Sequence, residues 1–219
     1  MLLNPKAVKA AAGCVSDDPS RPSIQGVHVQ DGKLQATDGH IALTLTEVPM
    51  PAEDFPAVSG FSHDVPTCII RPKELTDALK GIPKRPSVPV LQRLAIGRNG
   101  NPAALELVTT DLDVVNRTTV RPIEGPYPNL EQVTPKTAPV FVTGLTVAVV
   151  LKLFKALQTA GVEIVRLELH KPLGAMTMHG ETSDGLKADA ILMPARVEGA
   201  RMVHATVVAG TPAADAVTK

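Results

Sequence analysis

Aromatic side chains are scarce in this chain of 219 residues, which has no Trp, one Tyr and four Phe. Proteins that bind single-stranded nucleic acid stack bases on aromatic rings, and aromatic cages hold quaternary ammonium groups, so the composition argues against both classes. An excess of one charge is also missing, because 22 Lys and Arg balance 22 Asp and Glu. This balance argues against a strongly basic nucleic-acid-binding surface or a polybasic membrane arm, but it leaves open a segregation of charge between faces.

Long apolar runs are missing as well. No stretch approaches the ~18 consecutive apolar residues of a membrane span, and the N-terminal residues lack the apolar core of a secretory signal. We therefore expect a cytoplasmic protein that does not bind membranes. The two cysteines, Cys14 and Cys68, have apolar neighbours and are interpreted as core thiols of a reduced compartment, with a disulfide as the alternative.

A pattern of one helix followed by three strands occurs three times. The helices are expected to begin near Leu3, Ile70 and Val142 and to run for about ten to fourteen residues, the first two with Pro at the first helical position. An Asp31-Gly32 turn between alternating apolar residues indicates a hairpin in the first repeat. The strands are expected at residues 24–30, 34–37 and 41–48, then 91–96, 104–109 and 114–120, then 162–169, 175–179 and 188–197, with leading strands at 67–70 and 140–142.

Two connecting segments divide these repeats. Residues 49–66 are rich in Pro, Ser and acidic side chains and are predicted to form a surface linker between the first two repeats. Residues 122–139 connect the second repeat to the third. The sequence therefore predicts an α+β fold with a domain of two repeats over residues 1–136 (linker 49–66), a half-domain over 137–197 and a mobile tail over 198–219.

Lysine recurs on all three predicted helices, at Lys6, Lys9, Lys73, Lys80, Lys152 and Lys155. On the third helix it lies opposite a predicted apolar face of Val149, Val150, Leu153, Phe154 and Leu157. If the helices line one surface, that surface is basic. The alternative is that these lysines belong to ordinary solvated helix faces.

The sequence shows no recognisable group of catalytic residues. The six histidines are dispersed, and the sequence contains no G-x-S-x-G, P-loop or G-x-G-x-x-G motif. Asp111 and Asp113 could share a cation on a loop, but solvated charges at a strand end are the simpler interpretation, and nothing supports Cys14 or Cys68 as a nucleophile. We expect no enzymatic activity, no cofactor and no metal.

Three segments lie in order at the ends and connectors of the repeats: residues 36–43 (ATDGHIAL), 123–135 (IEGPYPNLEQVTP) and 191–197 (ILMPARV). They resemble segments of the bacterial DNA polymerase III beta subunit family, the sliding clamps, which carry A-T-D-G-H-R-L-A, D-G-x-F-P-D-Y-x-x-V-x-P and V-M-P-M-R-L. The resemblance covers residues 1–197. Residues 1–126 resemble the middle domain of a clamp and residues 137–197 the second half of its last domain.

In that family each domain pairs two half-units, whose helices line the central hole of a ring around duplex DNA. The resemblance therefore implies about three half-units and a non-catalytic DNA polymerase processivity factor that binds double-stranded DNA without regard to sequence. It also implies that the six helix lysines and Arg21 face the DNA. A ring of twelve half-units would need four chains, so a homo-oligomer is expected.

The resemblance further implies a pocket in which polymerase and clamp-loader subunits bind through short linear motifs. The matching positions are Thr37, Gly39, His40, Ala42, Pro128, Val133, Ile191, Met193 and Pro194. The family pattern is not kept at Ile41, Leu130, Gln132 and Ala195. The alternative function is a truncated adaptor or competitor that binds clamp-binding peptides without encircling DNA.

Overall fold

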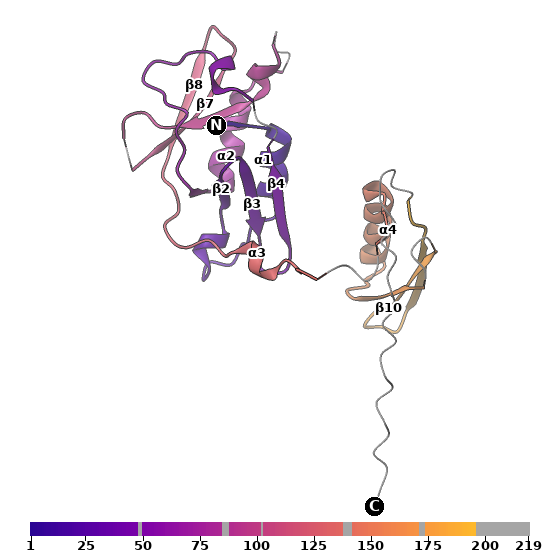
Figure 1. Cartoon of the computed structure of the whole chain (residues 1–219). Coiled ribbons are helices and arrows are strands. Elements are labelled where there is room, and N and C mark those ends of the chain that lie inside the picture. Colours follow the sequence, from indigo (N-terminus) through magenta and orange to yellow (C-terminus); the bar gives the residue numbers. More distant parts are fainter. Residues whose placement is uncertain (48–49, 85–87, 102, 138–141, 171–173, 196–219) are drawn as a thin grey trace, which may run out of the picture. The chain divides into compact units, whose positions relative to one another are not determined.

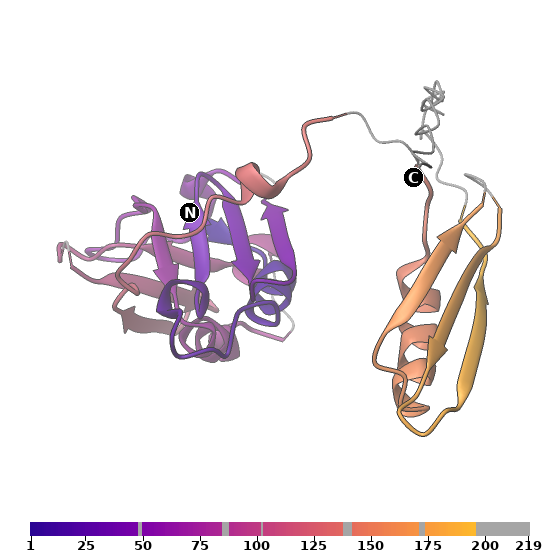
Figure 2. The same cartoon turned by 90° about the horizontal axis from the view of Figure 1, so that it is seen from below.

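The computed structural model describes residues 1–47, 50–84, 88–101, 103–137, 142–170 and 174–195. The chain divides into two compact units, Met1–Thr134 and Pro135–Lys219, and each is described here by itself (Figures 1 and 2). The expected strand at 140–142 falls largely outside the described residues, and the expected tail over 198–219 falls wholly outside them.

Two short helices begin at prolines in the first unit. Helix α1 spans Pro5–Ala12, where the Asn4 side chain accepts a hydrogen bond from the N–H of Lys6 at 2.9 Å, and α2 spans Pro72–Ala78. A proline at this position loses no helical hydrogen bond because its nitrogen would be unpaired there in any case. Both helices are shorter than predicted, and α2 continues as a 3-10 turn over Leu79–Gly81.

Two four-stranded antiparallel sheets accompany these helices, with strand orders β4-β3-β2-β5 and β8-β7-β6-β1. The strands span Leu2–Leu3 (β1), Val27–Gln30 (β2), Lys33–Thr37 (β3), Ala42–Thr46 (β4), Cys68–Ile70 (β5), Leu94–Gly97 (β6), Leu105–Thr110 (β7) and Val115–Val120 (β8). The first half of this unit contains α1 and β2–β4, and the second half contains α2 and β6–β8. The short strand before each helix pairs with the sheet of the other half: Ile70 of β5 lies opposite Val27 of β2, and Leu3 of β1 lies opposite Leu94 of β6. The two halves of the first unit are therefore interlocked.

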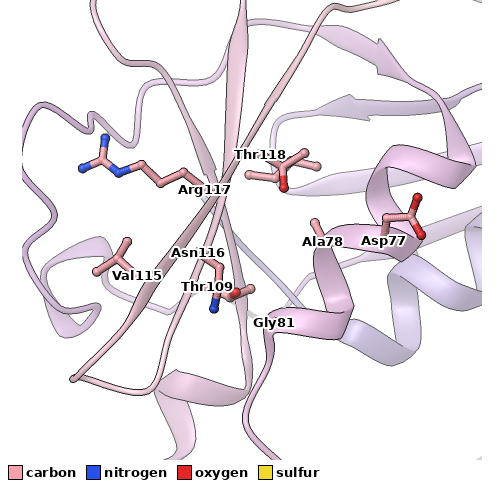
Figure 3. Close-up of a pocket in the computed structure, with 9 residues that line it drawn as sticks. Asp77, Ala78, Gly81, Thr109, Val115, Asn116, Arg117 and Thr118 are labelled. Carbon is pink, nitrogen blue, oxygen red and sulfur yellow. The ribbon is translucent and has the colours of Figure 1, made fainter.

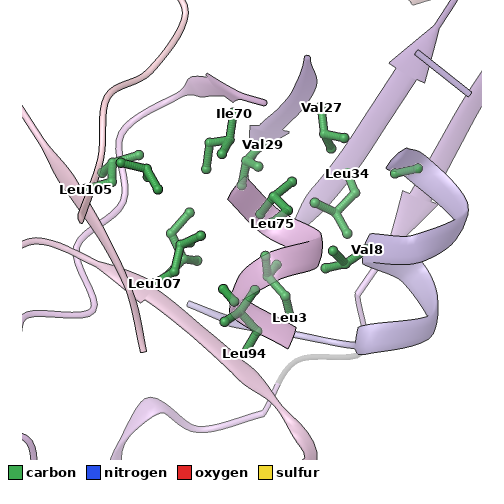
Figure 4. Close-up of a cluster of buried hydrophobic side chains, with 14 of the residues drawn as sticks. Leu3, Val8, Val27, Val29, Leu34, Ile70, Leu75, Leu94, Leu105 and Leu107 are labelled. Atoms are coloured by element: carbon green, nitrogen blue, oxygen red, sulfur yellow. The ribbon is translucent and has the colours of Figure 1, made fainter. Parts of the chain in front are cut away.

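One shared core joins these halves (Figure 4). Val8 of α1 and Leu75 of α2 are fully buried, and they pack in the same cluster as Leu34 of one sheet and Leu107 of the other. Each such side chain contributes roughly 1.5–3 kcal/mol by leaving water, so neither half keeps a complete core without the other.

Several predicted boundaries are wrong in this unit. Ile24 lies in a 3-10 turn over Pro22–Ile24 and Leu91 in another over Pro89–Gln92, because the prolines that begin these turns fix a helical φ. Strand β1 was missed because two residues are too few to show an alternating pattern. The linker 49–66 is not confined to the surface, since Phe55 is buried against Leu2, Ala95 and Val108.

The second unit contains one helix and one sheet. Helix α4 spans Val147–Thr159, and the sheet has the order β11-β10-β9, with strands Val165–Leu169 (β9), Met176–Glu181 (β10) and Lys187–Leu192 (β11). Its core is Met176, Met178 and Leu192, against which Val150 and Leu153 pack. The predicted apolar helix face is partly wrong, because Val149 and Phe154 are exposed: a single sheet covers only one side of the helix.

Both cysteines are free, Cys68 buried and Cys14 partly buried. Burial raises the pKa of the Cys68 thiol to about 12, so it stays protonated at neutral pH and is no nucleophile. No helix in the described parts of the chain combines the length and apolar character needed to cross a membrane.

Candidate functional site

The turn between β3 and β4 carries the predicted pocket positions Thr37, Gly39, His40 and Ala42, and side-chain hydrogen bonds fix its shape. The Thr37 hydroxyl donates to the carbonyl of Ile41 at 2.6 Å and accepts from the N–H of Gly39 at 3.1 Å. An Asp38 carboxylate oxygen accepts from the N–H groups of His40 and Ile41 at 2.7 and 2.8 Å, and these bonds lower the pKa of Asp38. Gly39 has a φ of 97°, which only glycine adopts without strain. Thr37 is thus a buried structural residue, whereas His40 and Ala42 are exposed.

Arg21 lies beside this turn. Its guanidinium forms an ion pair with Asp18 at 3.1 Å and donates to the carbonyl of Asp38 at 3.5 Å. A Cβ added at Gly39 would come within 2.8 Å of the same guanidinium, so the glycine makes room for Arg21. The sequence assigned Arg21 to the DNA surface, and the structure places it against the turn that carries the peptide-pocket positions.

The connector after β8 is held to the first sheet by two contacts. The N–H of Ile123 donates to the carbonyl of Ile69 at 2.7 Å, and the ring of Tyr127 stacks on His28 with 4.4 Å between centroids. Burial raises the pKa of Tyr127 to about 12. The short helix α3 (Leu130–Val133) follows, capped by Asn129, and both Pro128 and Val133 are exposed. Figures 1 and 2 show α3 next to the sheet that contains β3.

The remaining pocket positions belong to the second unit. Ile191 and Met193 are 69% and 67% exposed, at the end of β11, while the intervening Leu192 points into the core. Pro194 is partly buried and precedes Ala195, which bridges to Gly144. Two large apolar side chains are therefore presented to solvent on one side of a strand end.

The lysines assigned to DNA are exposed on their helices, but two of them share one acidic partner. Lys73 and Lys80 lie 2.8 and 2.6 Å from the two carboxylate oxygens of Asp77. The hydrogen bond from Lys73, followed by that from Lys80, lowers the pKa of Asp77 to about 2, so the carboxylate is charged at neutral pH. Among the described residues the ion pairs do not include Lys6, Lys9, Lys152 or Lys155.

Helices α1 and α2 pack side by side (Figure 1), so four of these lysines come from neighbouring helices of one unit. No side chain that reads base edges accompanies them on α1, whose polar residues are Lys6 and Lys9 alone. The lysines of this arrangement can make salt-dependent contacts with phosphates.

A hollow of about 330 Å³ lies between α2 and the strands β7 and β8 (Figure 3). Its lining is polar, but its charged groups are already paired: Asp77 with the two lysines, and Arg117 with Glu106 at 3.3 Å and with the carbonyl of Ser59. Within the residues that the structure describes, no three His, Cys, Asp or Glu side chains are grouped to hold a metal. An Asp111 carboxylate oxygen accepts hydrogen bonds from the N–H groups of Asp113 and Val114, and these bonds close the turn between β7 and β8.

Sequence reasoning missed two features of these surfaces. Asp77 stands four residues after Lys73 and three before Lys80, a spacing that places opposite charges together on a helix and could have revealed the cluster. The stacking of Tyr127 on His28 joins residues about a hundred positions apart, and no local pattern signals it.

No protein-family model and no curated protein matches the sequence. Solved structures do match, with 15–18% identity over about nine-tenths of this chain. The beta sliding clamp of Caulobacter crescentus is 18% identical, with a TM-score of 0.64, 89% of this chain covered and 50% of that chain. The beta subunit of Streptococcus pyogenes DNA polymerase is 18% identical (TM-score 0.58, 90% and 50%), and the Bacillus subtilis clamp is 16% identical (TM-score 0.60, 89% and 48%).

This chain therefore spans about half the length of the clamps that it matches. The match confirms the predicted α+β clamp fold, in which helices pack on antiparallel strands. The chain has the fold of the bacterial DNA polymerase III beta sliding clamps, over about half of their length.

Proposed function

We propose that the protein is a non-catalytic, cytoplasmic replication accessory factor that tracks duplex DNA and tethers replication proteins through a peptide-binding surface. The clamp fold is the observation that carries this proposal. DNA is the proposed ligand of the helix lysines, which suit sequence-independent contact with phosphates.

Two peptide-binding surfaces are proposed, one at the exposed residues of the β3–β4 turn and the connector in the first unit, and one at the end of β11 in the second unit. Support comes from the fixed turn around Gly39 and from the exposure of Ile191 and Met193, since Met adapts to varied apolar partners. The Bartonella birtlesii clamp was solved bound to griselimycin, and the Caulobacter crescentus clamp with PEG at the region proposed to tether the beta-motif.

Topological retention on DNA tests the tracking function. The protein would be loaded on nicked circular duplex at low salt, washed at high salt, and compared with the same DNA after linearisation. Retention on the circle and loss from the linear form is the expected result. Equal loss from both forms, with peptide binding intact, would favour the adaptor that does not encircle DNA.

Replacing Asp77 by Asn should strengthen duplex binding. The substitution releases Lys73 and Lys80 from their shared carboxylate, so we expect affinity to rise roughly threefold to tenfold and the salt dependence to steepen by up to about two phosphate equivalents. Fluorescence anisotropy of a labelled duplex over a salt series measures both. Asp31→Asn, the same charge change in the β2–β3 turn, is the control, and an equal gain in both variants would contradict a local effect.

Replacing Met193 by Glu should weaken the binding of a short peptide that inserts a Leu or Phe side chain. A charged group in an apolar contact costs a few kcal/mol, so an affinity loss of about 30-fold or more is expected by anisotropy of a labelled clamp-binding pentapeptide. Leu186→Glu is the matched control, because Leu186 is 54% exposed at the opposite end of β11. Unchanged affinity in the Met193 variant would remove Met193 from the site.

A further inference from the structure

The second unit leaves an unusual amount of apolar surface exposed. Eighteen large apolar side chains are exposed in the described residues, and twelve of them lie between Val142 and Met193, although this unit is the smaller one. In the described residues its core cluster has only three buried members, with Leu157 and Val162 also buried in this unit, against seventeen in the main cluster of the first unit. A single chain segment of roughly 50–60 residues needs a better core than this to be stable alone.

In the first unit, each half of one helix and one sheet is covered by the other half. Helix α1 packs against α2, and the outer edge of β2 pairs with β5, the strand that precedes α2. The second half is covered in the same way, since the outer edge of β6 pairs with β1. Each half thus buries its helix side and its strand edge against the other half.

The same two surfaces are uncovered in the second unit. Strand β9 occupies the sheet position of β2 and β6, and in the described residues it pairs with β10 alone. On α4, Leu151 and Phe154 are 54% and 42% exposed. A groove of about 710 Å³ runs between this helix and the start of β9, at Val165, with Leu151 and Phe154 in its lining.

We propose that a second copy of this chain covers the groove, with its own half-unit of α4, β9, β10 and β11 packed against the first about a two-fold axis. The two halves of the first unit are covered reciprocally by units of the same type, which is the relation that a symmetric dimer imposes on identical surfaces. Every copy carries one half-unit that is uncovered in the described residues, so each copy offers the same surface to a partner. In such a dimer the half-unit of each chain covers the half-unit of the other, and together they form one domain of two halves.

Self-association of the full chain tests this proposal without DNA or peptide. Sedimentation equilibrium over a concentration series should give an even multiple of the chain mass of 23.0 kDa, with the dimer as the smallest associated species. Leu151→Glu should raise the dimer dissociation constant about 30-fold or more, because it places a charge in a buried apolar contact. Phe154→Glu provides a second variant. Neither substitution removes a side chain that is buried within one copy, and far-UV circular dichroism checks that both variants fold.

Val114→Glu is the matched control, since Val114 is also 54% exposed but belongs to the first unit, and it should leave the dimer intact. Hydrogen exchange gives an independent measurement: the amides of β9 should be protected more strongly as the concentration rises. A wild-type protein that stays monomeric, or a dimer that neither α4 variant weakens beyond the control, would overturn the proposal. Loss of DNA retention in a protein that still dimerises would instead count against the proposed function.

Discussion

Reversing the charge of Lys6, Lys73 and Lys152 together should lower the affinity for duplex DNA about 100-fold and reduce the salt slope by about two phosphate equivalents, because Lys73 is already held by Asp77. One lysine is taken from each of α1, α2 and α4, and all three are exposed, so the substitutions leave the cores intact. Anisotropy titrations of one labelled duplex at several salt concentrations give both quantities. Far-UV circular dichroism separates lost phosphate contacts from a general loss of fold.

The control is a second triple variant with the same change in net charge, in which Lys33, Lys136 and Lys187 become Glu. These lysines are exposed on a strand, on the chain after α3 and on another strand. If DNA meets the helices, the control should lose only the small amount that general repulsion causes. Equal losses in both triple variants would mean that binding follows net charge, and the helices would then have no special role.

The sequence predicted the order of elements well because the signals for that order are local. Pro5 and Pro72 begin helices as expected, and the Asp31-Gly32 turn joins β2 to β3. Strand pairing across the two halves was not predicted, since β1 and β5 are too short for their partners to be inferred from periodicity. The interlocking that holds the first unit together is therefore a property of the tertiary structure.

The candidate sites also combine features that a local sequence segment determines with contacts that depend on the tertiary structure. Residues of the β3–β4 turn were named through their resemblance to a clamp segment, and their role in peptide binding stays a prediction. The structure shows that Thr37 and Asp38 close this turn through their own side chains. The position of Arg21 could not be predicted, because its contact with the turn depends on how the loop after α1 returns to the sheet. The assignment of Arg21 to DNA stays a prediction, and the structure adds that its guanidinium contacts Asp18 and the carbonyl of Asp38.

Replacing Gly97 by Ala should destabilise the first unit by about 3 kcal/mol, the upper range for forcing extra atoms into a packed core. An added Cβ would lie 1.9 Å from the carbonyl oxygen of Ser62 and 2.7 Å from the ring of Phe61. That carbonyl cannot easily move, since it accepts a hydrogen bond from the N–H of Arg98 at 2.8 Å. Residues 61 and 62 belong to the segment that the sequence predicted to be a surface linker, so the importance of Gly97 was hidden from sequence analysis.

Tyrosine fluorescence during urea unfolding measures this effect in the first unit alone, because Tyr127 is the one tyrosine of the chain and there is no tryptophan. Gly13→Ala is the control: its φ is −84°, and an added Cβ there would meet only backbone oxygens at 3.6 and 3.7 Å. The control should change the free energy of unfolding by less than about 0.5 kcal/mol. If Gly97→Ala lowered the free energy of unfolding as little as the control does, the segment around Ser62 would have to move away from β6 at little cost. The packing of Phe55 would then hold this segment only weakly.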